Sequence, residues 1–279
     1  MGRPSPVTQA ERHEPPRAEN IAHEEPIRSG AQSVERAVAI LQCFATGPSE
    51  RGISELASAL HLGPSTVHRL VRALCDGGLL AQDARTERYH LGPTTALLGQ
   101  LAVEQFGFAL ARGELEQLAA DTGESVNLGV RQHDEVVTLL AAASREPLRV
   151  DQRAGTRVPV HASAMGKAIL AFGSDGLAET VGALTSLERL TKNTITSRRR
   201  LTAELAVVRA KGFAVNDEER NVGVRAIAAP VLDQAGTARA AIAVQGPSVR
   251  MAAASTEMIA RAAAVTASRV ARLVPLELL

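Results

Sequence analysis

Residues 52–92 contain the pattern that most constrains how this chain can fold. The segment 53–60 places apolar residues at the i, i+3, i+4 and i+7 positions of one helix face, with Ser54 as the predicted N-cap. Gly63 then predicts a turn. Pro64 predicts the first position of a second helix, because a proline there loses no hydrogen bond. The sequence therefore predicts two short helices joined by a tight turn.

The second helix has two chemically different faces. One face is apolar and consists of Val67, Leu70, Val71 and Leu74. The opposite face and its flanks are polar, and they carry Ser65, Thr66, His68, Arg69 and Arg72. Arginine can bind guanine bidentately or hold a phosphate, and hydroxyls near a helix N-terminus suit phosphate oxygens. A solvated helix face is the alternative, but the helix-turn-helix spacing favours insertion of this helix into the major groove of DNA.

A two-stranded wing is predicted after this helix. Its strands cover 79–82 and 88–91, with a turn between them. Arg85 and Arg88 are predicted to contact the DNA backbone or the minor groove, which would position the protein more than it would specify sequence. Two residues of the second strand are predicted to pack inward, Tyr89 and Leu91.

The sequence before the two helices predicts an arm followed by one more helix. Residues 1–30 are rich in Pro, Glu, Arg and Ala without apolar periodicity, which predicts a disordered arm. Ser33 is the predicted cap of a helix that ends at Phe44 and completes a three-helix core. Its predicted buried side consists of Val34, Ala37, Val38 and Leu41. A winged helix-turn-helix domain over 31–92 follows from this arrangement.

Residues 93–120 read as a helical linker, interrupted near Gly107 and Gly113. From Glu124 the period changes to the alternation of strands, which opens a second domain over 121–279. This domain begins with a β-hairpin. Further helices are predicted at 162–172, 175–183, 197–211 and 250–273, and further strands at 213–216, 224–231 and 238–245. The predicted class is α+β, with an antiparallel sheet covered by helices.

Composition narrows the classes of function. With 45% hydrophobic residues, a mean hydropathy of +0.00 and no long apolar run, the chain is expected to be cytoplasmic, with no membrane contact. Cys43 and Cys75 are expected to be small buried residues, and the scattered histidines predict neither a metal site nor a cofactor. A net charge of +1 argues against a general nucleic-acid coat, whereas a sequence-specific reader needs only a local basic patch.

Several blocks of the sequence resemble the IclR-type transcriptional regulators. In the second domain these blocks are RVPVHASAMGKA at 157–168, GFAVNDEE at 212–219 and GVRAIAAPV at 223–231. In the first domain they are STVHRL at 65–70 and YHLG at 89–92. The resemblance covers residues 31–272 with the blocks in the family's order, and this combination is more specific than any one block.

The resemblance implies a winged DNA reader joined by a helix to a GAF-like domain that binds a small-molecule effector. It also implies self-association as a dimer or a dimer of dimers, and therefore an inverted-repeat operator in double-stranded DNA. The family's effector contacts map here to Ala164, Met165, Asn216, Ala226, Ala243 and Gln245. An apolar wall is expected from Val150, Val158 and Val224.

The mapped positions depart from the family's glyoxylate-binding branch. An acid, a cysteine and two serines stand there at the places held here by Asn216, Ala226, Ala243 and Gln245. A different effector is therefore expected: a small organic acid or a ureide such as allantoate, with aromatic acids next. The alternative for Asn216 and Gln245 is that each amide pairs with backbone.

Two other functions remain open at this stage. The first is a ligand-independent repressor whose second domain only oligomerises, since Ala226 and Ala243 lack polar groups. The second is an enzyme. Ser163 and Lys167 are four residues apart, not the three of a Ser-x-x-Lys pair, and the acidic run 217–219 has no histidine partner at motif spacing. A non-catalytic repressor is the expected function.

Overall fold

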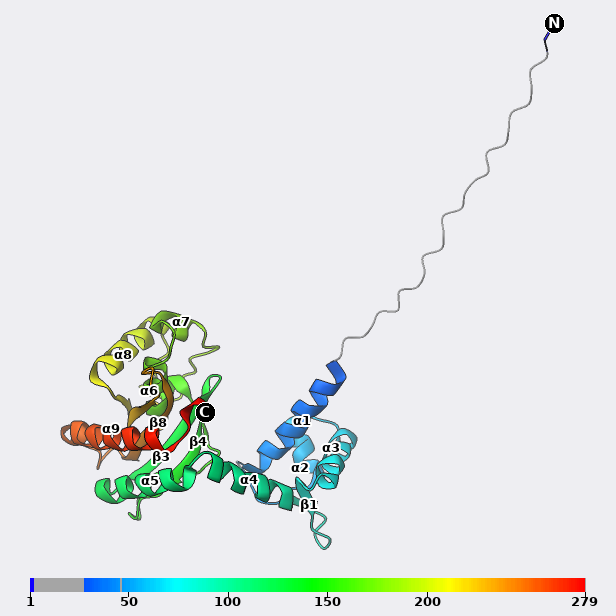
Figure 1. Cartoon of the computed structure of the whole chain (residues 1–279), viewed down its shortest axis with the longest axis horizontal. Helices are drawn as coiled ribbons and strands as arrows, with labels where there is room; N and C mark the ends of the chain where they lie inside the picture. The colour runs from blue at the N-terminus through cyan, green and yellow to red at the C-terminus, as the bar shows by residue number, and fades with distance from the viewer. Residues whose placement is uncertain (3–27, 46, 279) are drawn as a thin grey trace.

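The computed structural model describes residues 1–2, 28–45 and 47–278. Most of the predicted arm over 1–30 lies outside these residues. Figure 1 shows an N-terminal unit of packed helices and a C-terminal unit built around a sheet, with helix α4 running between them. The α+β class predicted from the sequence is confirmed.

The N-terminal unit is a three-helix core with a hairpin. Its elements are α1 (Arg28–Ala45), α2 (Ile53–Leu60), α3 (Pro64–Asp76), β1 (Leu80–Gln82) and β2 (Tyr89–Leu91). The apolar faces of the three helices meet in one cluster, which the wing closes with Leu80 and Tyr89. This is the arrangement predicted for a winged helix-turn-helix.

Helix α1 buries only part of the face that was predicted, because Ala37 and Leu41 pack against the core as expected but Val34 and Val38 do not. Val34 and Val38 are 64% and 46% exposed, whereas Ile40 and Phe44 are buried against α2 and α3. Both sets of residues have helical spacing, because apolar residues occupy two neighbouring stripes of this helix. Docking against the other two helices selected the stripe with the larger side chains. The prediction for Val34 and Val38 was wrong.

Two helix starts and one wing residue also differ from prediction. Helix α1 already begins at Arg28, before the predicted cap Ser33. The N-cap of α2 is Gly52 and not Ser54, because the side chain of Glu55 accepts a hydrogen bond from the Gly52 backbone N–H at 3.0 Å.

In the wing, Leu91 is 43% exposed and does not pack inward as Tyr89 does. Strand β2 ends at Leu91, and the chain turns away at Gly92 to begin α4. The inner face of the wing therefore stops at Tyr89.

The linker consists of α4 (Pro93–Gln105) and α5 (Phe108–Thr122), separated at Gly107. Gly107 has a φ of 62°, and any side chain there would overlap the carbonyl of Leu273. The close approach explains a glycine at this break. The interruption predicted near Gly113 is absent, because α5 buries one face under the sheet and this packing keeps the helix continuous.

The C-terminal unit is a six-stranded sheet in the order β5-β4-β3-β8-β7-β6, with every neighbouring pair antiparallel. The short edge strand β5 was not predicted. The strands are β3 (Ser125–Gln132), β4 (Glu135–Ala142), β5 (Arg157–Pro159), β6 (Ala214–Asp217), β7 (Val224–Leu232) and β8 (Ala238–Pro247). The helices are α6 (Ala164–Ala171), α7 (Leu177–Gly182), α8 (Arg198–Lys211) and α9 (Thr256–Leu273), with short 3-10 turns at Val160–Ala162, 253–255 and Leu276–Leu278.

The sheet separates two apolar layers. One face packs on α5 and α9, and the other packs on α6, α7 and α8. Along β8, Ile242 and Val244 point to the first layer, while Ala241 and Ala243 point to α6. The alanines on the second face leave space beside the N-terminal end of α6, and the candidate ligand site lies there.

Candidate functional site

The polar face of α3 is exposed as the sequence predicted. Its apolar residues Val67, Leu70, Val71 and Leu74 are all buried. Ser65, His68, Arg69 and Arg72 are exposed, and Thr66 is half-buried. Within the part of the chain that the structure describes, neither Arg69 nor Arg72 forms an ion pair, so both guanidinium groups are available to an external anion.

The two wing arginines have different surroundings. Arg85 is exposed at the hairpin tip, where the side chain of Asp83 accepts hydrogen bonds from the backbone N–H groups of Arg85 and Thr86 at 2.8 Å. These bonds lower the pKa of Asp83. Arg88 instead donates to the carboxylate of Glu55 at 2.7 Å and to the carbonyl of Glu50 at 3.0 Å. Arg88 thereby ties the wing to the start of α2.

A small cavity lies between the N-terminal end of α6 and the sheet. Eight of the nine residues predicted to contact an effector line it, and they are Ala164, Met165, Asn216, Ala226, Ala243, Gln245, Val158 and Val224. Val150 does not line it. The chain turns inward two residues later, so that the side chain of Gln152 occupies this wall instead. The cavity volume of about 20 Å³ has room for one water molecule.

Four polar lining residues were not predicted: Gln152, Ser163, Arg220 and Asn221. The side chain of Gln152 donates to the Thr138 hydroxyl at 2.7 Å and accepts from the Arg220 guanidinium at 3.1 Å. Ser163 caps α6 by accepting a hydrogen bond from the Gly166 backbone N–H at 3.1 Å. Arg220 was missed because it directly follows the acidic run 217–219. From sequence alone, an arginine beside several acids is expected to be a solvent-exposed residue.

Asn216 makes backbone contacts at both ends of its amide. Its Nδ2 donates to the carbonyl of Ala162, and its Oδ1 accepts from the Glu219 backbone N–H at 3.1 Å. The alternative weighed for this residue, a buried amide paired with backbone, is therefore realised in the structure. Asn216 still lines the cavity and joins the start of α6 to the end of β6.

Unlike Asn216, Gln245 has a side-chain amide that is not fully hydrogen-bonded. It is 4% exposed, and its Nε2 has no hydrogen-bond partner among the described residues. The Nδ2 of Asn127 also has no partner there. Asn127 lies opposite Ala243 in the register of β3 and β8, and therefore on the cavity side of the sheet. Buried donors of this kind cost free energy unless something accepts their hydrogen bonds.

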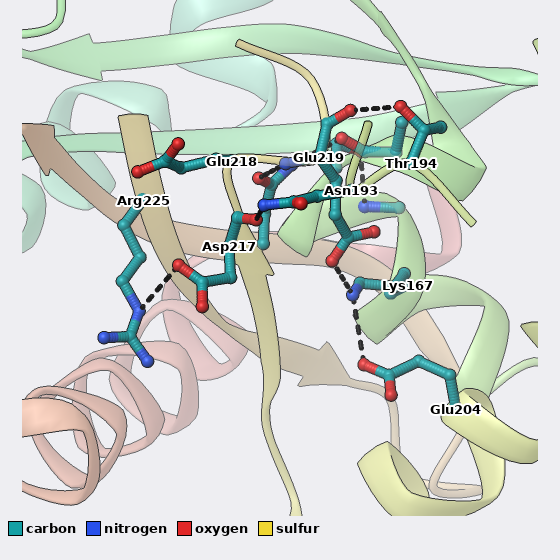
Figure 2. Close-up of polar contacts among 12 residues, drawn as sticks. Lys167, Asn193, Thr194, Glu204, Asp217, Glu218, Glu219 and Arg225 are labelled. Carbon is teal, nitrogen blue, oxygen red and sulfur yellow. Dashed lines mark hydrogen bonds and ion pairs between the residues drawn. The ribbon is translucent and has the colours of Figure 1, made fainter. Parts of the chain in front are cut away.

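An ionic cluster centred on the buried Lys167 includes Glu219, which directly precedes the cavity residue Arg220. Lys167 on α6 is fully buried, and its Nζ lies 2.6 Å from Glu219 Oε1 and 3.0 Å from Glu204 Oε1. Figure 2 shows the two carboxylates converging on this nitrogen from different elements. Burial raises the pKa of Glu219, although Lys167 opposes that shift. The acidic run was read from the sequence as a loop edge, but Glu219 is a buried partner of Lys167.

The same cluster holds the loop before α8. The carbonyl of Glu219 accepts hydrogen bonds from the hydroxyls of Thr194 at 2.6 Å and Thr191 at 3.2 Å. The side chain of Asn193 donates to the carbonyl of Asp217 at 3.1 Å, and Asp217 pairs with Arg225 at 3.7 Å (Figure 2). These contacts join the residues beside the cavity into one polar network.

Metal-binding clusters and membrane-spanning helices are both absent from the described residues. No group of three or more His, Cys, Asp or Glu side chains is placed to hold a metal ion. None of the helices seen there is long and apolar enough to cross a lipid bilayer.

Comparisons with known proteins match both units of the chain. A family model described as the IclR helix-turn-helix domain matches residues 33–84, and one described as the bacterial transcriptional regulator IclR C-terminal domain matches residues 107–272. The HTH-type transcriptional regulator BhcR of Paracoccus denitrificans is 38% identical over 223 residues, which is 80% of each chain. The HTH-type transcriptional repressor AllR of Salmonella typhimurium is 31% identical over 227 residues, covering 80% of this chain and 83% of that protein.

A solved structure is similar over both units as well. It is an IclR homologue from Microbacterium hydrocarbonoxydans in complex with 4-hydroxybenzoate. It has a TM-score of 0.73 and 25% sequence identity, and it covers 86% of this chain and 99% of its own.

Proposed function

Because this chain belongs to the IclR family of bacterial transcriptional regulators, we propose that it represses transcription by binding a specific operator, and that a small metabolite controls this binding. The observation that carries the proposal is the exposed polar face of α3, combined with a cavity in the second unit that has several polar residues in its lining. We assign the DNA reader to 31–92, the linker to 93–120 and the effector-binding and oligomerisation domain to 121–279.

DNA contact is supported by the exposed residues of α3. Arg69 and Arg72 face outward with no internal acid partner among the described residues, as a major-groove helix requires. Ser65, Thr66 and His68 stand at or beside its N-terminal turn, where phosphate oxygens bind well. We propose that Arg85 contacts the DNA backbone directly and that Arg88 acts by holding the wing through Glu55.

Effector binding is supported by the unpaired donor of Gln245 and by the relatives. One relative is named a repressor, and one solved neighbour holds 4-hydroxybenzoate. We propose a small organic acid or a ureide as the effector. A cavity of about 20 Å³ would have to widen to hold either. The ligand-independent repressor remains the second candidate, favoured by this small volume and by the internal pairing of Asn216.

Binding to the DNA upstream of the protein's own gene tests this function. The purified full-length protein is expected to shift that DNA in a salt-sensitive and sequence-specific manner, and one compound from a panel of carboxylates and ureides is expected to change the shift. An operator shift that no compound changes would favour the ligand-independent repressor. A protein that binds no promoter DNA from its own genome would contradict the proposal.

Self-association is supported by the apolar surface of α4. This helix buries none of its residues, and Leu97, Leu98 and Leu101 are more than half exposed. Val34 and Val38 of α1 add further exposed apolar surface. Exposed apolar side chains gathered on one helix in this way are typical of a protein interface. We propose that a second copy of the chain covers it, which gives two DNA readers and an inverted-repeat operator.

The double substitution Leu98→Glu/Leu101→Glu is expected to convert the oligomer into monomers, because it places four charges in the two-fold interface. Light scattering after size-exclusion chromatography measures the change in mass. The control is Gln100→Glu, which adds charge to the same helix at another exposed position. A double variant with the mass of the wild-type oligomer would contradict an interface on α4.

We place this activity in the cytoplasm, where bacterial operator DNA is found. The families matched here are regulators and not enzymes, and we propose no catalytic step for this chain.

A further inference from the structure

We propose that Arg220 is the residue that selects the effector, and that it does so by binding a carboxylate. The effector would then be a small organic acid and not an uncharged ureide. This inference rests on the proposed function, since it assumes that the cavity beside α6 is the effector site. It adds a specificity-determining residue that the sequence pattern of the family did not indicate.

The first observation is that Arg220 lacks an acid partner. Among the described residues, its one hydrogen bond to another side chain is to the neutral amide of Gln152, at 3.1 Å. Within the described residues no carboxylate forms an ion pair with it. Burial lowers the pKa of Arg220, and no nearby acid offsets this effect. A half-buried guanidinium group loses part of its hydration, and an anion that pairs with it offsets this cost.

The second observation is the contrast with Lys167, which is fully buried whereas Arg220 is half-buried. Lys167 contacts two carboxylates of the same chain, so the protein itself completes its pairing. Figure 2 shows both acids directed at the one nitrogen of Lys167. Of these two cations, only Arg220 lines the cavity. The protein therefore neutralises Lys167 with its own acids and leaves the half-buried Arg220 for an external group.

The third observation is that the cavity holds donors without matching acceptors. None of its lining residues, all of which the structure describes, carries a carboxylate. Gln245 contributes an Nε2 with no partner, and Ala164 and Met165 form the first turn of α6, where the helix dipole favours a negative charge. A carboxylate has two oxygens, and it would accept from the Arg220 fork and from Gln245 together.

Gln152 explains how the site is arranged before the ligand binds. Its Oε1 accepts from Arg220 while its Nε2 donates to Thr138 at 2.7 Å, so the guanidinium is held at the cavity wall. Arg220 is thus positioned by a neutral group, which a carboxylate can displace or join. An uncharged amide would gain less from the same fork, because hydrogen bonds between neutral and charged groups are weaker than those between two ions of opposite charge.

Matched acids and amides test this inference on the full-length protein. The probes are glycolate, pyruvate and 4-hydroxybenzoate, each beside its amide, together with allantoate beside allantoin, and binding is measured by titration calorimetry. At least one acid is expected to bind far more tightly than its uncharged counterpart. Arg220→Gln is expected to weaken that acid about 10- to 100-fold, and Arg220→Lys is expected to weaken it less, because the charge remains without the fork.

The control is Arg153→Gln, which removes an exposed arginine close to the cavity wall and should change the affinity less than about twofold. Tight binding of an acid that survives Arg220→Gln would overturn the inference, as would binding confined to the uncharged compounds or the absence of binding by any acid. Operator binding, measured separately, tests the proposed function. A protein that binds acid through Arg220 but no operator would contradict that function and leave this inference standing.

A ligand-free measurement adds an independent readout. If Arg220 is held for an anion, Arg220→Met should melt at or above the wild-type temperature without ligand, because the variant no longer holds a half-buried cation without an acid partner. Lys167→Met should melt well below it. A fall for Arg220→Met as large as that for Lys167→Met would make Arg220 a structural residue and overturn its assignment.

Discussion

Replacing Lys167 with methionine is expected to lower the free energy of unfolding by about 3–5 kcal/mol, the loss typical of breaking a buried ion pair from one side. The variant would keep the carboxylates of Glu219 and Glu204 beside a site with no cation. Glu219 is 6% exposed, and its Oε2 already lacks a hydrogen-bond partner among the described residues. Denaturant unfolding of the purified protein measures the loss. A decrease below about 1 kcal/mol would contradict the predicted importance of the cluster.

The loss should shrink in acid. Burial raises the pKa of Glu219 above its ordinary value of 4.5, so the folded state takes up this proton more readily than the unfolded state. Removing Lys167 strengthens this preference, because the cation was opposing it. As the pH falls from the raised folded-state pKa towards 4.5, protonation relieves the buried charge and the variant regains stability relative to wild type.

Two variants control for these effects. Lys211→Met removes an exposed lysine and should change stability by less than about 0.5 kcal/mol. Lys167→Met/Glu219→Gln should be more stable at neutral pH than Lys167→Met alone, because it removes one of the uncompensated acids. A single variant with the same loss at every pH would show that lost packing, and not buried charge, dominates.

Replacing Arg69 with alanine is expected to weaken operator binding by about 1–3 kcal/mol at particular base pairs. The physical reason is the bidentate pairing of a guanidinium with the major-groove edge of guanine. Binding to operators substituted one base pair at a time measures the effect. Base-pair preference should relax at the position that Arg69 reads and persist elsewhere. Equal weakening on all sequences would assign Arg69 to a phosphate.

Two controls accompany this measurement. Arg131→Ala removes an exposed arginine of the second unit and should leave operator binding unchanged. If Arg72 binds a phosphate, Arg72→Ala should weaken binding to all DNA sequences alike. The slope of log affinity against log salt concentration should then fall by about 1. Wild-type affinity in Arg69→Ala would contradict the assignment of α3 as the reading helix.

The reading helix was predictable because its signals are local. Pro64 at a helix start, an apolar stripe at helical spacing and a paired glycine at the end all act within a few residues. Helix α1 shows the limit of such signals. Two apolar stripes satisfied the same period, and only the surfaces of α2 and α3 decided that Ile40 and Phe44 would be buried.

The cavity was predicted largely through resemblance, and its polar residues show what the resemblance missed. Eight mapped positions line it, but Val150 does not, and Gln152 and Arg220 were not anticipated. Gln152 and Arg220 are 68 residues apart in the chain. No rule of sequence spacing connects them, because the loop that carries Gln152 and the segment after β6 that carries Arg220 meet only in the folded chain.

The sequence alone determined the kinds of elements, their order and the amphipathic reading helix, because periodicity and turn residues act over short distances. The tertiary structure decided which charged side chains are paired within the protein and which are not. Lys167 meets Glu204 and Glu219 across 37 and 52 residues and is wholly buried, whereas Arg220 is brought to a cavity without an acid. Whether a charged side chain is solvated, neutralised or left for a ligand depends on which distant groups share its low-dielectric surroundings, and only the folded chain brings those groups together.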